Sequence, residues 1–518
     1  MRYDIMKICM SAVRVCTAAA FLIVVGLEAS HAGNDMPAEV NRFRSIVRSR
    51  DVATYSAAAA GLRRWMMAND PHYPLYHFVA PEGWINDPNG VIYHKGQYHL
   101  FYQYDPIVDG KRSARTWGHA VSTDLVHWQD WPVAIWPDTK YDRNGVWSGN
   151  MVIDEQGIPT ALYTGGVNGR AETYGMLARS RDGMVTWEKK MVMDQPPYPG
   201  TPVHWDAQVW KEGDTWFQLI GGTKDGKGAA LLWTSPDLEH WRYRKPIFCG
   251  PPGEFWELPY LLPFGQRFAL LIGVGGNPYW IGSYDRKAME FKPDTAAHPR
   301  FADYGTYYSF NPNMVDDKGP NGSPRRIMHG WVTGPKTPTR TVPYWEGAHS
   351  IPRVITVEGD RLLQTPIPEL SVLRGTHQRL TDLTVKPGWT GYLKDIAGDA
   401  LEIVARFEPA GANVTRFGLK TRVSGDGRQA TPVWFEPASR KFGAADRGGP
   451  SDLPGGQPVT LHVFVDRSIV EVYLNGNACT ARMFPDPQSL GLDLFADGGE
   501  VKVSSLEIWE MRTMWEGP

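Results

Sequence analysis

The sequence predicts an all-β protein in which a five-bladed β-propeller is followed by a C-terminal β-sandwich. Three observations predict this fold: tight-turn and aromatic residues are abundant, strand-like units recur along the first part of the chain, and apolar and polar residues alternate along the last part. The 518 residues include 21 Trp, 54 Gly and 41 Pro, a mixture that suits short strands joined by turns. The chain is longer than one hydrophobic core usually serves, so two domains are expected.

The N-terminus has the features of a secretory signal. Basic residues precede an apolar run from Val15 to Leu27, and the small residues of Ser30-His31-Ala32 offer a cleavage site. So short a run is a poor membrane span. We therefore expect residues 1–32 to be a signal peptide and the mature protein to be secreted or periplasmic, without a membrane partner. A signal anchor is the alternative.

Residues 33–72 follow, with apolar side chains at helical spacing. They are Phe43, Ile46, Val47, Leu62, Trp65 and Met66, with an alanine run at 57–60 between the two groups. We predict one or two helices here, whose simplest role is to pack against the main body.

Residues 73–355 contain five related units, which predict the five blades of the propeller. One recurring piece reads STDLVHW, SRDGMVTW, SPDLEHW and, more loosely, SYDRKAMEF, and its copies end at Trp128, Trp187, Trp241 and Phe291. A period of about 50 residues is typical of propeller blades. Before each copy the sequence has an apolar strand, a polar glycine-containing turn and a second apolar strand, and a fifth such hairpin runs from Asn311 to Trp331.

Polar residues occupy equivalent positions in four of these units. Asp87, Ser148, Asp206 and Glu257 each lie seven to nine residues before the turn glycine of their hairpin, at the start of the first strand. The first strands of propeller blades line the central channel, so these side chains should converge at one end of it. Asp87 lies inside the stretch WINDPNG, whose Pro-Asn-Gly run should stop both helix and regular strand and so fix the direction of the acid.

Three carboxylic acids in one pocket point to chemistry on a sugar. Burial and mutual repulsion raise their pKa values unequally, so that one acid can stay protonated while another is ionised. A pair of carboxylates in those two states cleaves glycosidic bonds through an oxocarbenium-like transition state. A single acid would be explained by turn capping, but three at equivalent blade positions favour catalysis.

The motifs resemble those of glycoside hydrolase family 32, which comprises invertases, levanases, inulinases and related fructosyl-transferring enzymes. In chain order they are WINDPNG (84–90), FYQYDP (101–106), WGHAVSTDLVHW (117–128), WSGN (147–150), WELP (256–259), RRIMHGW (325–331), WEGAHSIPR (345–353) and LHVFVDRSIVEVYLNG (461–476). The resemblance covers about residues 73–515.

The resemblance implies a role for each acid. Asp87 matches the nucleophile that attacks C2 of a fructofuranoside, Glu257 the general acid/base, and Asp206 the acid that stabilises the transition state. It also implies a fructose subsite formed by Asn86, Gln103, Trp117, Trp147 and Ser148. Trp205, the aromatic residue beside Asp206, is expected to bind substrate as well. Neither a metal nor a cofactor is expected. The expected partner is sucrose or a fructose-containing oligo- or polysaccharide, and the net charge of −2 gives no reason to expect nucleic acid.

The sequence departs from the family pattern at two places, each next to an acid that this chain retains. Where the family usually has Arg-Asp-Pro, this chain has Trp205-Asp206-Ala207, so a guanidinium is missing. Where it usually has Glu-Cys-Pro-Asp, this chain has Glu257-Leu258-Pro259-Tyr260. These changes predict an active enzyme with altered subsite binding.

The function that the sequence favours is therefore a retaining glycoside hydrolase that releases β-fructofuranosyl units from fructans (levan or inulin) or sucrose through a covalent fructosyl-enzyme. One alternative is a fructosyltransferase on the same fold, including one that forms a cyclic difructose. Another is a non-catalytic carbohydrate-binding propeller, and arabinanase-like propellers are a weaker third.

The remaining residues change in character. Residues 356–377 are expected to be a linker with a strand and a short helix, and residues 378–518 alternate apolar and polar residues in the manner of a β-sandwich. Asp466 and Glu471 fall in this domain, and we interpret them as structural residues at strand ends rather than as sugar contacts.

Overall fold

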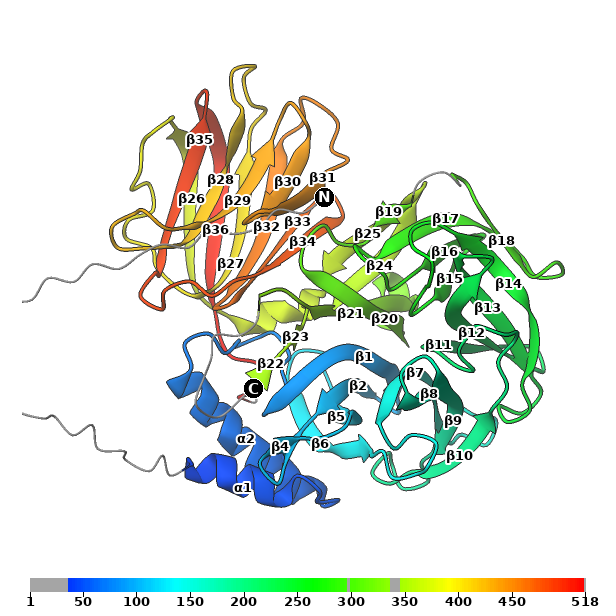
Figure 1. Ribbon diagram of the computed structural model, residues 1–518. Coiled ribbons are helices and arrows are strands. Elements are labelled where there is room, and N and C mark those ends of the chain that lie inside the picture. The colour runs from blue at the N-terminus through cyan, green and yellow to red at the C-terminus, as the bar shows by residue number, and fades with distance from the viewer. Residues whose placement is uncertain (1–35, 296–298, 336–344, 517–518) are drawn as a thin grey trace, which may run out of the picture. The chain divides into compact units, whose positions relative to one another are not determined.

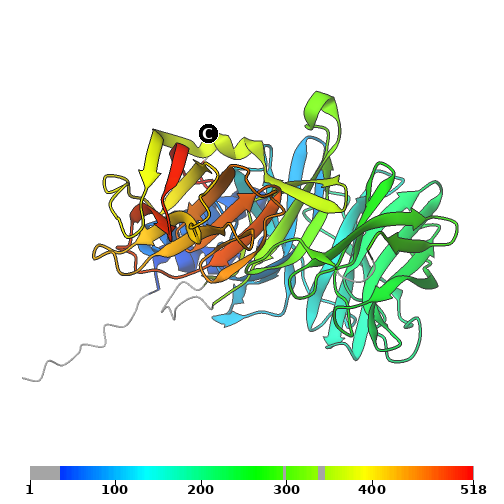
Figure 2. The same cartoon turned by 90° about the horizontal axis from the view of Figure 1, so that it is seen from above.

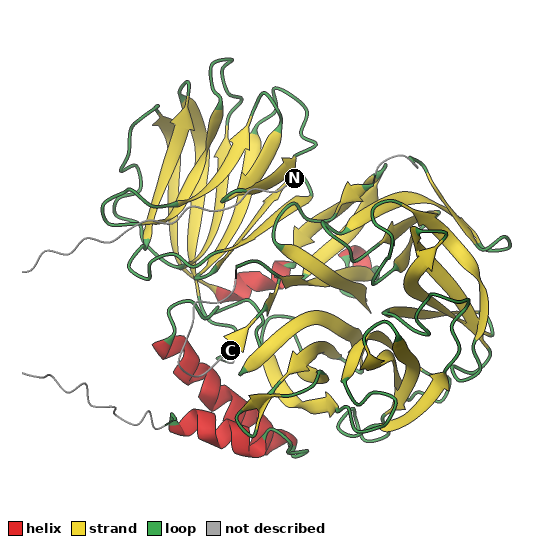
Figure 3. Ribbon diagram, in the orientation of Figure 1, coloured by secondary structure: helices red, strands yellow, loops and turns green. Residues whose placement is uncertain are grey.

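The computed structural model describes residues 36–295, 299–335 and 345–516 (Figure 1). The predicted signal peptide lies outside the described residues. Strands dominate the described part of the chain, as Figure 3 shows. Neither of its two α-helices is long and apolar enough to cross a membrane. Residues 38–518 cluster as one compact unit.

Two helices precede the first sheet. They are α1 (Ala38–Ile46) and α2 (Val52–Asn69), and Asp51 caps α2 by accepting a hydrogen bond from the Thr54 N–H at 2.8 Å. Arg63 of α2 is 1% exposed and forms two hydrogen bonds to the Asp130 carboxylate, from Nε at 2.6 Å and from Nη2 at 2.8 Å. A buried, bidentate ion pair therefore attaches α2 to β6 of the first sheet.

Between residues 83 and 366 the described strands form five sheets that correspond to the five units of the sequence (Figure 1, and from a second direction Figure 2). The first sheet holds β1 (Gly83–His94), β2 (Gln97–Asp105), β5 (Thr116–Ser122), β6 (Trp128–Ile135) and the short β22 (Trp345–Glu346). The second holds β7 (Gly145–Ile153), β8 (Pro159–Asn168), β9 (Glu172–Arg179) and β10 (Glu188–Met193). A separate hairpin, β3 (Ile107–Val108) and β4 (Lys111–Arg112), lies between β2 and β5 in the chain.

The other three sheets have the same order. The third holds β11 (Ala207–Glu212), β12 (Thr215–Lys224), β13 (Lys227–Ser235) and β14 (Arg242–Gly250). The fourth holds β15 (Tyr260–Phe264), β16 (Arg267–Leu271), β17 (Pro278–Asp285), β18 (Glu290–Pro293) and β19 (Arg300–Phe301). The fifth holds β20 (Tyr307–Asp316), β21 (Arg325–Val332), β23 (Ala348–His349), β24 (Arg353–Glu358) and β25 (Arg361–Pro366), with the 3₁₀ turn η1 (Pro320–Gly322) between β20 and β21.

The first strands of the sheets lie against one another around a common axis. β1 contacts both β7 and β20, and β7 contacts β11. Gln208 of β11 exchanges two hydrogen bonds with the Leu261 backbone of β15, at 2.7 and 3.2 Å. The contact of β1 with β20 joins the first sheet to the fifth, and the short β22 pairs in parallel with the start of β1. This is the arrangement of a β-propeller, with its inner strands positioned to carry a site.

The stretch WINDPNG does not interrupt its strand. It lies within β1, but the pairing of β1 with β2 shifts register between Ile85 and Pro88 and again between Asn89 and Ile92. Gly90 has a φ of 47°, and a Cβ there would lie 3.1 Å from the Trp117 ring. The Pro-Asn-Gly run therefore makes the strand irregular around the acid, as expected, but does not end it.

The boundary after the propeller also differs from the prediction. β25, placed in the expected linker, pairs with β24 as the outer strand of the fifth sheet, with Val354 opposite Thr365. The hairpin between them turns at Gly359, where φ is 59°. The connection is then the short η2 (Pro368–Leu373), and the next sheet starts at residue 374.

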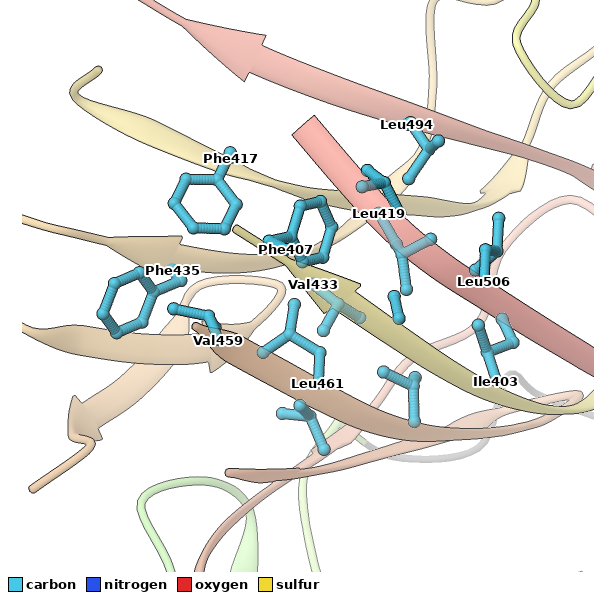
Figure 4. Packing of buried hydrophobic residues seen from close by; sticks show 14 of the residues in the cluster. Ile403, Phe407, Phe417, Leu419, Val433, Phe435, Val459, Leu461, Leu494 and Leu506 are labelled. Carbon is cyan, nitrogen blue, oxygen red and sulfur yellow. The ribbon is translucent and has the colours of Figure 1, made fainter. Parts of the chain in front are cut away.

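The C-terminal sandwich has two sheets. One contains β26 (Arg374–Val385), β36 (Val501–Met511), β27 (Ala400–Phe407), β32 (Val459–Asp466), β33 (Ile469–Leu474) and β34 (Asn477–Arg482). The other contains β31 (Arg447–Pro450), β30 (Lys441–Ala444), β29 (Thr431–Glu436), β28 (Arg416–Val423) and β35 (Gly491–Asp497). Buried side chains from both sheets form one core, in which Phe407, Phe417 and Leu461 are central (Figure 4).

Asp466 and Glu471 connect the sandwich to the chain before and within the propeller. Asp466 accepts hydrogen bonds from the backbone N–H groups of residues 75, 76 and 77 at 2.7 to 2.9 Å. Glu471 forms an ion pair with Arg353 of β24 at 2.9 Å, and both side chains are fully buried. Their contacts are those of structural residues.

Candidate active site

A pocket of about 180 Å³ lies where the inner strands begin, and residues of all five sheets or the segments leading into them line it. Its lining consists of Asn86, Asp87, Gln103, Arg115, Trp147, Trp205, Asp206, Glu257, Tyr308, Ser309 and Trp331. The three acids predicted from equivalent positions in the repeats therefore meet in one pocket.

Asp87 is held by neutral hydrogen-bond donors. Ser148 Oγ donates to Asp87 Oδ2 at 2.5 Å, Gln103 Nε2 to the same oxygen at 3.4 Å, and Asn86 Nδ2 to Oδ1 at 3.0 Å. Gln103 also donates to Ser148 Oγ. Asp87 is 8% exposed. The carboxylate is thus fixed in direction, with one face open to the pocket.

Left-handed backbone occurs at three non-glycine residues around the pocket. Asp206 has a φ of 46°, Leu258 of 47° and Ser309 of 45°. Such conformations are costly for residues with a Cβ, and they concentrate at functional sites. The strain at Asp206 is held by a buried chain in which its N–H donates to Thr164 Oγ1 at 3.0 Å and that hydroxyl contacts His204 Nδ1 at 2.8 Å.

Glu257 has a different set of donors. Tyr308 Oη donates to Glu257 Oε2 at 2.7 Å, while Trp205 Nε1 and Arg170 Nη2 both lie 3.2 Å from Oε1. The residue before it, Trp256, is fully buried and its ring N–H donates to the Pro252 carbonyl at 2.8 Å. The buried Trp256 therefore fixes the backbone next to Glu257, whose side chain is 22% exposed.

Burial and mutual charge perturb the acids. Burial raises the pKa of Asp206 well above its ordinary value, and the negative charges of Glu257 and Asp87 add to this effect. Burial also raises the pKa of Asp87, although hydrogen bonds from Ser148 and Ser309 oppose the shift. Burial and nearby negative charge thus act in the same direction on Asp206 and Asp87.

Aromatic rings form the wall of the pocket. The Trp147 and Trp205 rings meet edge to face with centroids 5.3 Å apart, and Trp205 meets Phe255 in the same way at 5.6 Å. On the other side, Trp331 packs edge to face with Trp84 at 5.7 Å. Flat apolar surfaces around a floor of carboxylates can hold a sugar ring between stacking contacts and hydrogen bonds.

Two buried acceptors in the pocket have no partner among the described residues. These are Asn86 Oδ1 and Gln103 Oε1, whose amide nitrogens both donate to Asp87. A buried polar atom left without a partner is costly, so a pocket built this way favours a ligand that carries hydroxyl groups.

Two residues expected to bind substrate lie behind the pocket wall. Ser148 is fully buried and contacts Asp87 rather than the open space. Trp117 is fully buried, and its ring N–H donates to the Trp147 carbonyl at 3.0 Å. The motif identifies a residue of the site region, but it does not distinguish a wall residue from one that supports the wall.

Several residues of the site were not predicted from the sequence. Arg170, Arg115, Tyr308 and Ser309 all lie at the pocket or touch its acids. Tyr308 and Ser309 lie near the start of β20, just before the fifth hairpin of the sequence, so the repeat alignment carried a signal for them. Arg170 and Arg115 lie in turns outside the repeated pieces, where the sequence carries no such signal.

The two departures from the family pattern are both at the acids. Trp205 replaces a cation by a ring N–H that donates to Glu257. Tyr260 is fully buried against Phe310, with ring centroids 5.7 Å apart, and its hydroxyl has no partner among the described residues. Burial raises the pKa of Tyr260 well above its ordinary value, and the charges of Asp206 and Asp87 add to the shift.

In the part of the chain that the structure describes, no group of three or more His, Cys, Asp or Glu side chains is arranged to hold a metal ion.

Known proteins match the chain along both domains. The N-terminal domain of glycosyl hydrolases family 32 matches residues 77–366, and the C-terminal domain of that family matches residues 369–510. A levanase of Bacillus subtilis is 32% identical over 505 residues, covering 86% of this chain and 71% of the levanase. A sucrose-6-phosphate hydrolase of Zymomonas mobilis is 28% identical over 517 residues, covering 91% of this chain and 97% of that protein.

A solved structure has the same fold. The crystal structure of fructan 1-exohydrolase IIa from Cichorium intybus superimposes with a TM-score of 0.74 at 24% identity, covering 86% of this chain and 98% of the other. The propeller, the sandwich and both domain matches agree with the order of motifs in the sequence. This chain therefore belongs to glycosyl hydrolase family 32.

Proposed function

We propose that the protein is a retaining glycoside hydrolase that releases β-fructofuranosyl units from fructans or sucrose. The observation that carries the proposal is the meeting of Asp87, Asp206 and Glu257 in one aromatic-walled pocket at the end of the propeller channel. Family relatives named levanase, sucrose-6-phosphate hydrolase and fructan 6-exohydrolase support the same class of substrate.

The proposed reaction has two displacements. In the first, an Asp87 oxygen attacks C2 of the fructosyl unit while Glu257 gives its proton to the glycosidic oxygen, so the C2–O bond breaks and the leaving sugar departs with that proton. In the second, Glu257 takes a proton from water, whose oxygen attacks C2 and releases Asp87 as a carboxylate. Asp206 holds sugar hydroxyls as positive charge develops on the ring.

Product analysis tests this proposal. The purified protein is incubated separately with sucrose, inulin and levan, and the products are separated by chromatography. We expect free fructose from at least one substrate and, when methanol is added, a methyl β-fructofuranoside, because a retaining enzyme passes the fructosyl group with the same anomeric configuration.

The Glu257→Gln variant, purified in the same way, shows whether a contaminating fructosidase makes the fructose. A cyclic difructose or longer fructans as main products would mean a transferase. No product from any of the three substrates would contradict the proposal and favour a carbohydrate-binding propeller.

Ser148 is expected to act on the reaction through Asp87. The Ser148→Ala variant loses a short hydrogen bond to a charged group, which is worth about 1.5–3 kcal/mol, so kcat/KM should fall by about 10- to 100-fold. Initial rates on the preferred substrate measure this. The exposed Ser283 of β17 offers a matched control, and a Ser148→Ala rate equal to that of Ser283→Ala would show that the contact has no role in turnover.

We also propose that the mature protein is secreted or periplasmic, on the evidence of the basic, apolar and small-residue segments in residues 1–32. N-terminal sequencing of the protein recovered from the medium or periplasm tests this, and a start near residue 33 is expected.

A further inference from the structure

A guanidinium from the second sheet reaches the acid/base candidate. Arg170 lies in the turn between β8 and β9, and its Nη2 is 3.2 Å from Glu257 Oε1. The guanidinium carbon lies 3.7 Å from the centre of the Phe255 ring and 5.2 Å from the centre of the Trp205 ring. Arg170 is thus held between an aromatic face and a carboxylate, a geometry in which a cation is well stabilised.

The position of this contact is informative because the usual arginine is absent. Trp205 occupies the place where the family usually has an arginine, and its ring N–H donates to the same Glu257 oxygen that Arg170 contacts. The two side chains therefore contribute differently to Glu257, since Trp205 supplies a neutral donor and Arg170 supplies the positive charge from a different blade.

We propose that Arg170 is a positioning residue for Glu257 and a binding residue for the sugar that leaves. This proposal rests on the fructosidase function proposed above. Arg170 lies in a turn outside the family motifs. It would supply the positive charge that the usual arginine provides, and it would contribute to the specificity for the leaving group.

The location of Arg170 supports the second part. A general acid gives its proton to the glycosidic oxygen, so the leaving sugar must lie next to Glu257. Asp87 and Asp206 form the buried floor, at 8% and 7% exposure, whereas the Arg170 side chain is 53% exposed. Arg170 therefore lies on the outer side of Glu257, away from the floor that would hold the fructosyl ring.

Arg170 also has hydrogen-bonding capacity left for a ligand. A guanidinium carries five N–H donors, and the contact with Glu257 uses one of them. The Phe255 ring beneath it keeps the plane of the guanidinium fixed, which lowers the entropy lost when it binds a hydroxyl. A sugar placed against this plane could accept hydrogen bonds from it.

The positive charge of Arg170 acts on the acids of the pocket. The groups that face Glu257 are Asp87 and Asp206, which are negative when ionised, the Tyr308 hydroxyl, and the cations Arg170 and Arg115 at the rim. Burial and the Glu257 and Asp87 charges raise the pKa of Asp206, and Arg170 opposes this shift. Removing Arg170 would leave the acids with less compensation.

The first test is the pH dependence of kcat/KM for Arg170→Gln and Arg170→Lys. The alkaline limb of a retaining glycosidase reports loss of the proton from the acid/base. Arg170→Gln removes the cation that lies 3.2 Å from Glu257 Oε1, so the alkaline limb should move to higher pH. Arg170→Lys keeps the charge and should keep the wild-type limb.

The second test separates the leaving-group site from the fructose pocket. In Arg170→Gln, kcat/KM on sucrose and on an inulin-type trisaccharide should fall about 10-fold, because a charged hydrogen bond to the leaving sugar is lost. Inhibition by free fructose, which needs only the inner pocket, should change less than about twofold. Arg181→Gln is the matched control: Arg181 lies in the turn between β9 and β10, is 58% exposed and pairs with Glu188 away from the site.

Each outcome decides the proposal. An Arg170→Gln variant with the wild-type pH limb and wild-type kcat/KM overturns it while the fructosidase function stands. If fructose inhibition weakens as much as kcat/KM falls, the assignment to the leaving group is wrong. If the wild type turns over none of the substrates, the proposed function and this inference fail together.

Discussion

Replacing Asp87 by Asn should lower kcat/KM on sucrose and fructans by about 10⁴-fold or more, because an amide cannot form the covalent fructosyl-enzyme. The substitution is close to isosteric. Ser148, Gln103 and Asn86 surround the side chain with polar atoms, so the pocket should keep its shape. Initial rates over long incubations measure the loss, and the thermal unfolding midpoint shows whether the variant is folded.

The control for Asp87→Asn is an exposed acid of the same propeller. Asp225 lies at the β12–β13 turn with its side chain 80% exposed, and Asp225→Asn should keep the wild-type rate. A folded Asp87→Asn variant within about tenfold of the wild type would mean that another group attacks C2, and the order of events at the site would need a different nucleophile.

Glu257→Gln, the variant of the proposed acid/base, should behave differently from Asp87→Asn, the variant of the proposed nucleophile. A general acid contributes about 10²- to 10⁴-fold to the rate, and its contribution shrinks when the leaving group needs no proton. With an aryl β-fructofuranoside, Glu257→Gln should therefore keep a fast first step, seen as a burst of the phenol, whereas Asp87→Asn should show none. Comparing substrates with different leaving groups therefore assigns the role of each carboxylate separately.

The sequence predicted several strands of the sandwich from alternating or strand-favouring residues. The alternating runs at 401–409, 459–466 and 501–511 correspond to β27, β32 and β36. The same method missed β34, whose six residues are all buried, and β26, which is mostly exposed. β33 is also buried along its whole length but was predicted from its Ile, Val and Tyr residues, whereas β34 has few such residues and β26 is largely polar, so the pairing of these two strands is visible only in the fold.

The candidate site was likewise predictable only in part from the sequence. Repeats give equivalent positions, so the convergence of Asp87, Asp206 and Glu257 could be predicted from their spacing. The left-handed backbone at Asp206 could not, because neighbouring groups hold that conformation and the residue type alone does not determine it. Arg170 was missed for a related reason: its contact with Glu257 depends on how two blades face each other.

The second large effect concerns a buried charge network between the propeller and the sandwich. Arg353 of β24 donates to Glu471 Oε2 and Asp303 Oδ2, both at 2.9 Å, and to Thr480 Oγ1 at 2.8 Å. His77 lies on the other side of Glu471, with Nε2 3.2 Å from Oε1, and its Nδ1 is 2.9 Å from Asp466 Oδ2.

Replacing Arg353 by Leu should destabilise the protein by about 3–5 kcal/mol, because two buried carboxylates lose their cation. Thermal unfolding at a fixed scan rate and the half-life at elevated temperature measure this. Arg428 provides the control: it pairs with Asp426 at the surface and is 86% exposed, so Arg428→Leu should change stability by less than about 0.5 kcal/mol. Equal midpoints for the two variants would mean that the network contributes no stability.

The same network should make stability depend on pH on both sides of a plateau. Burial lowers the pKa of His77, but its hydrogen bonds to Asp466 and Glu471 outweigh this and raise it to about 9. Its contribution is therefore complete below its ordinary value of 6.5 and is lost as the pH rises through 9. Burial raises the pKa of Glu471, but the Arg353 charge and the His77 hydrogen bond lower it to about 2, so its contribution is complete above 4.5 and is lost as the pH falls through 2.

These two shifts place the plateau between about pH 4.5 and 6.5. Of these two groups, only His77 titrates above the plateau. Within the plateau, the His77→Gln variant should therefore unfold at a lower temperature than the wild type. Between pH 6.5 and 9, its unfolding midpoint should fall less steeply than that of the wild type. Unfolding midpoints of both proteins across pH 3 to 9 test this. If the unfolding midpoint of the variant falls as steeply as that of the wild type on the alkaline side, His77 carries no charge in the folded protein. The hydrogen bonds to Asp466 would then come only from the backbone N–H groups of residues 75–77 and from a neutral imidazole ring.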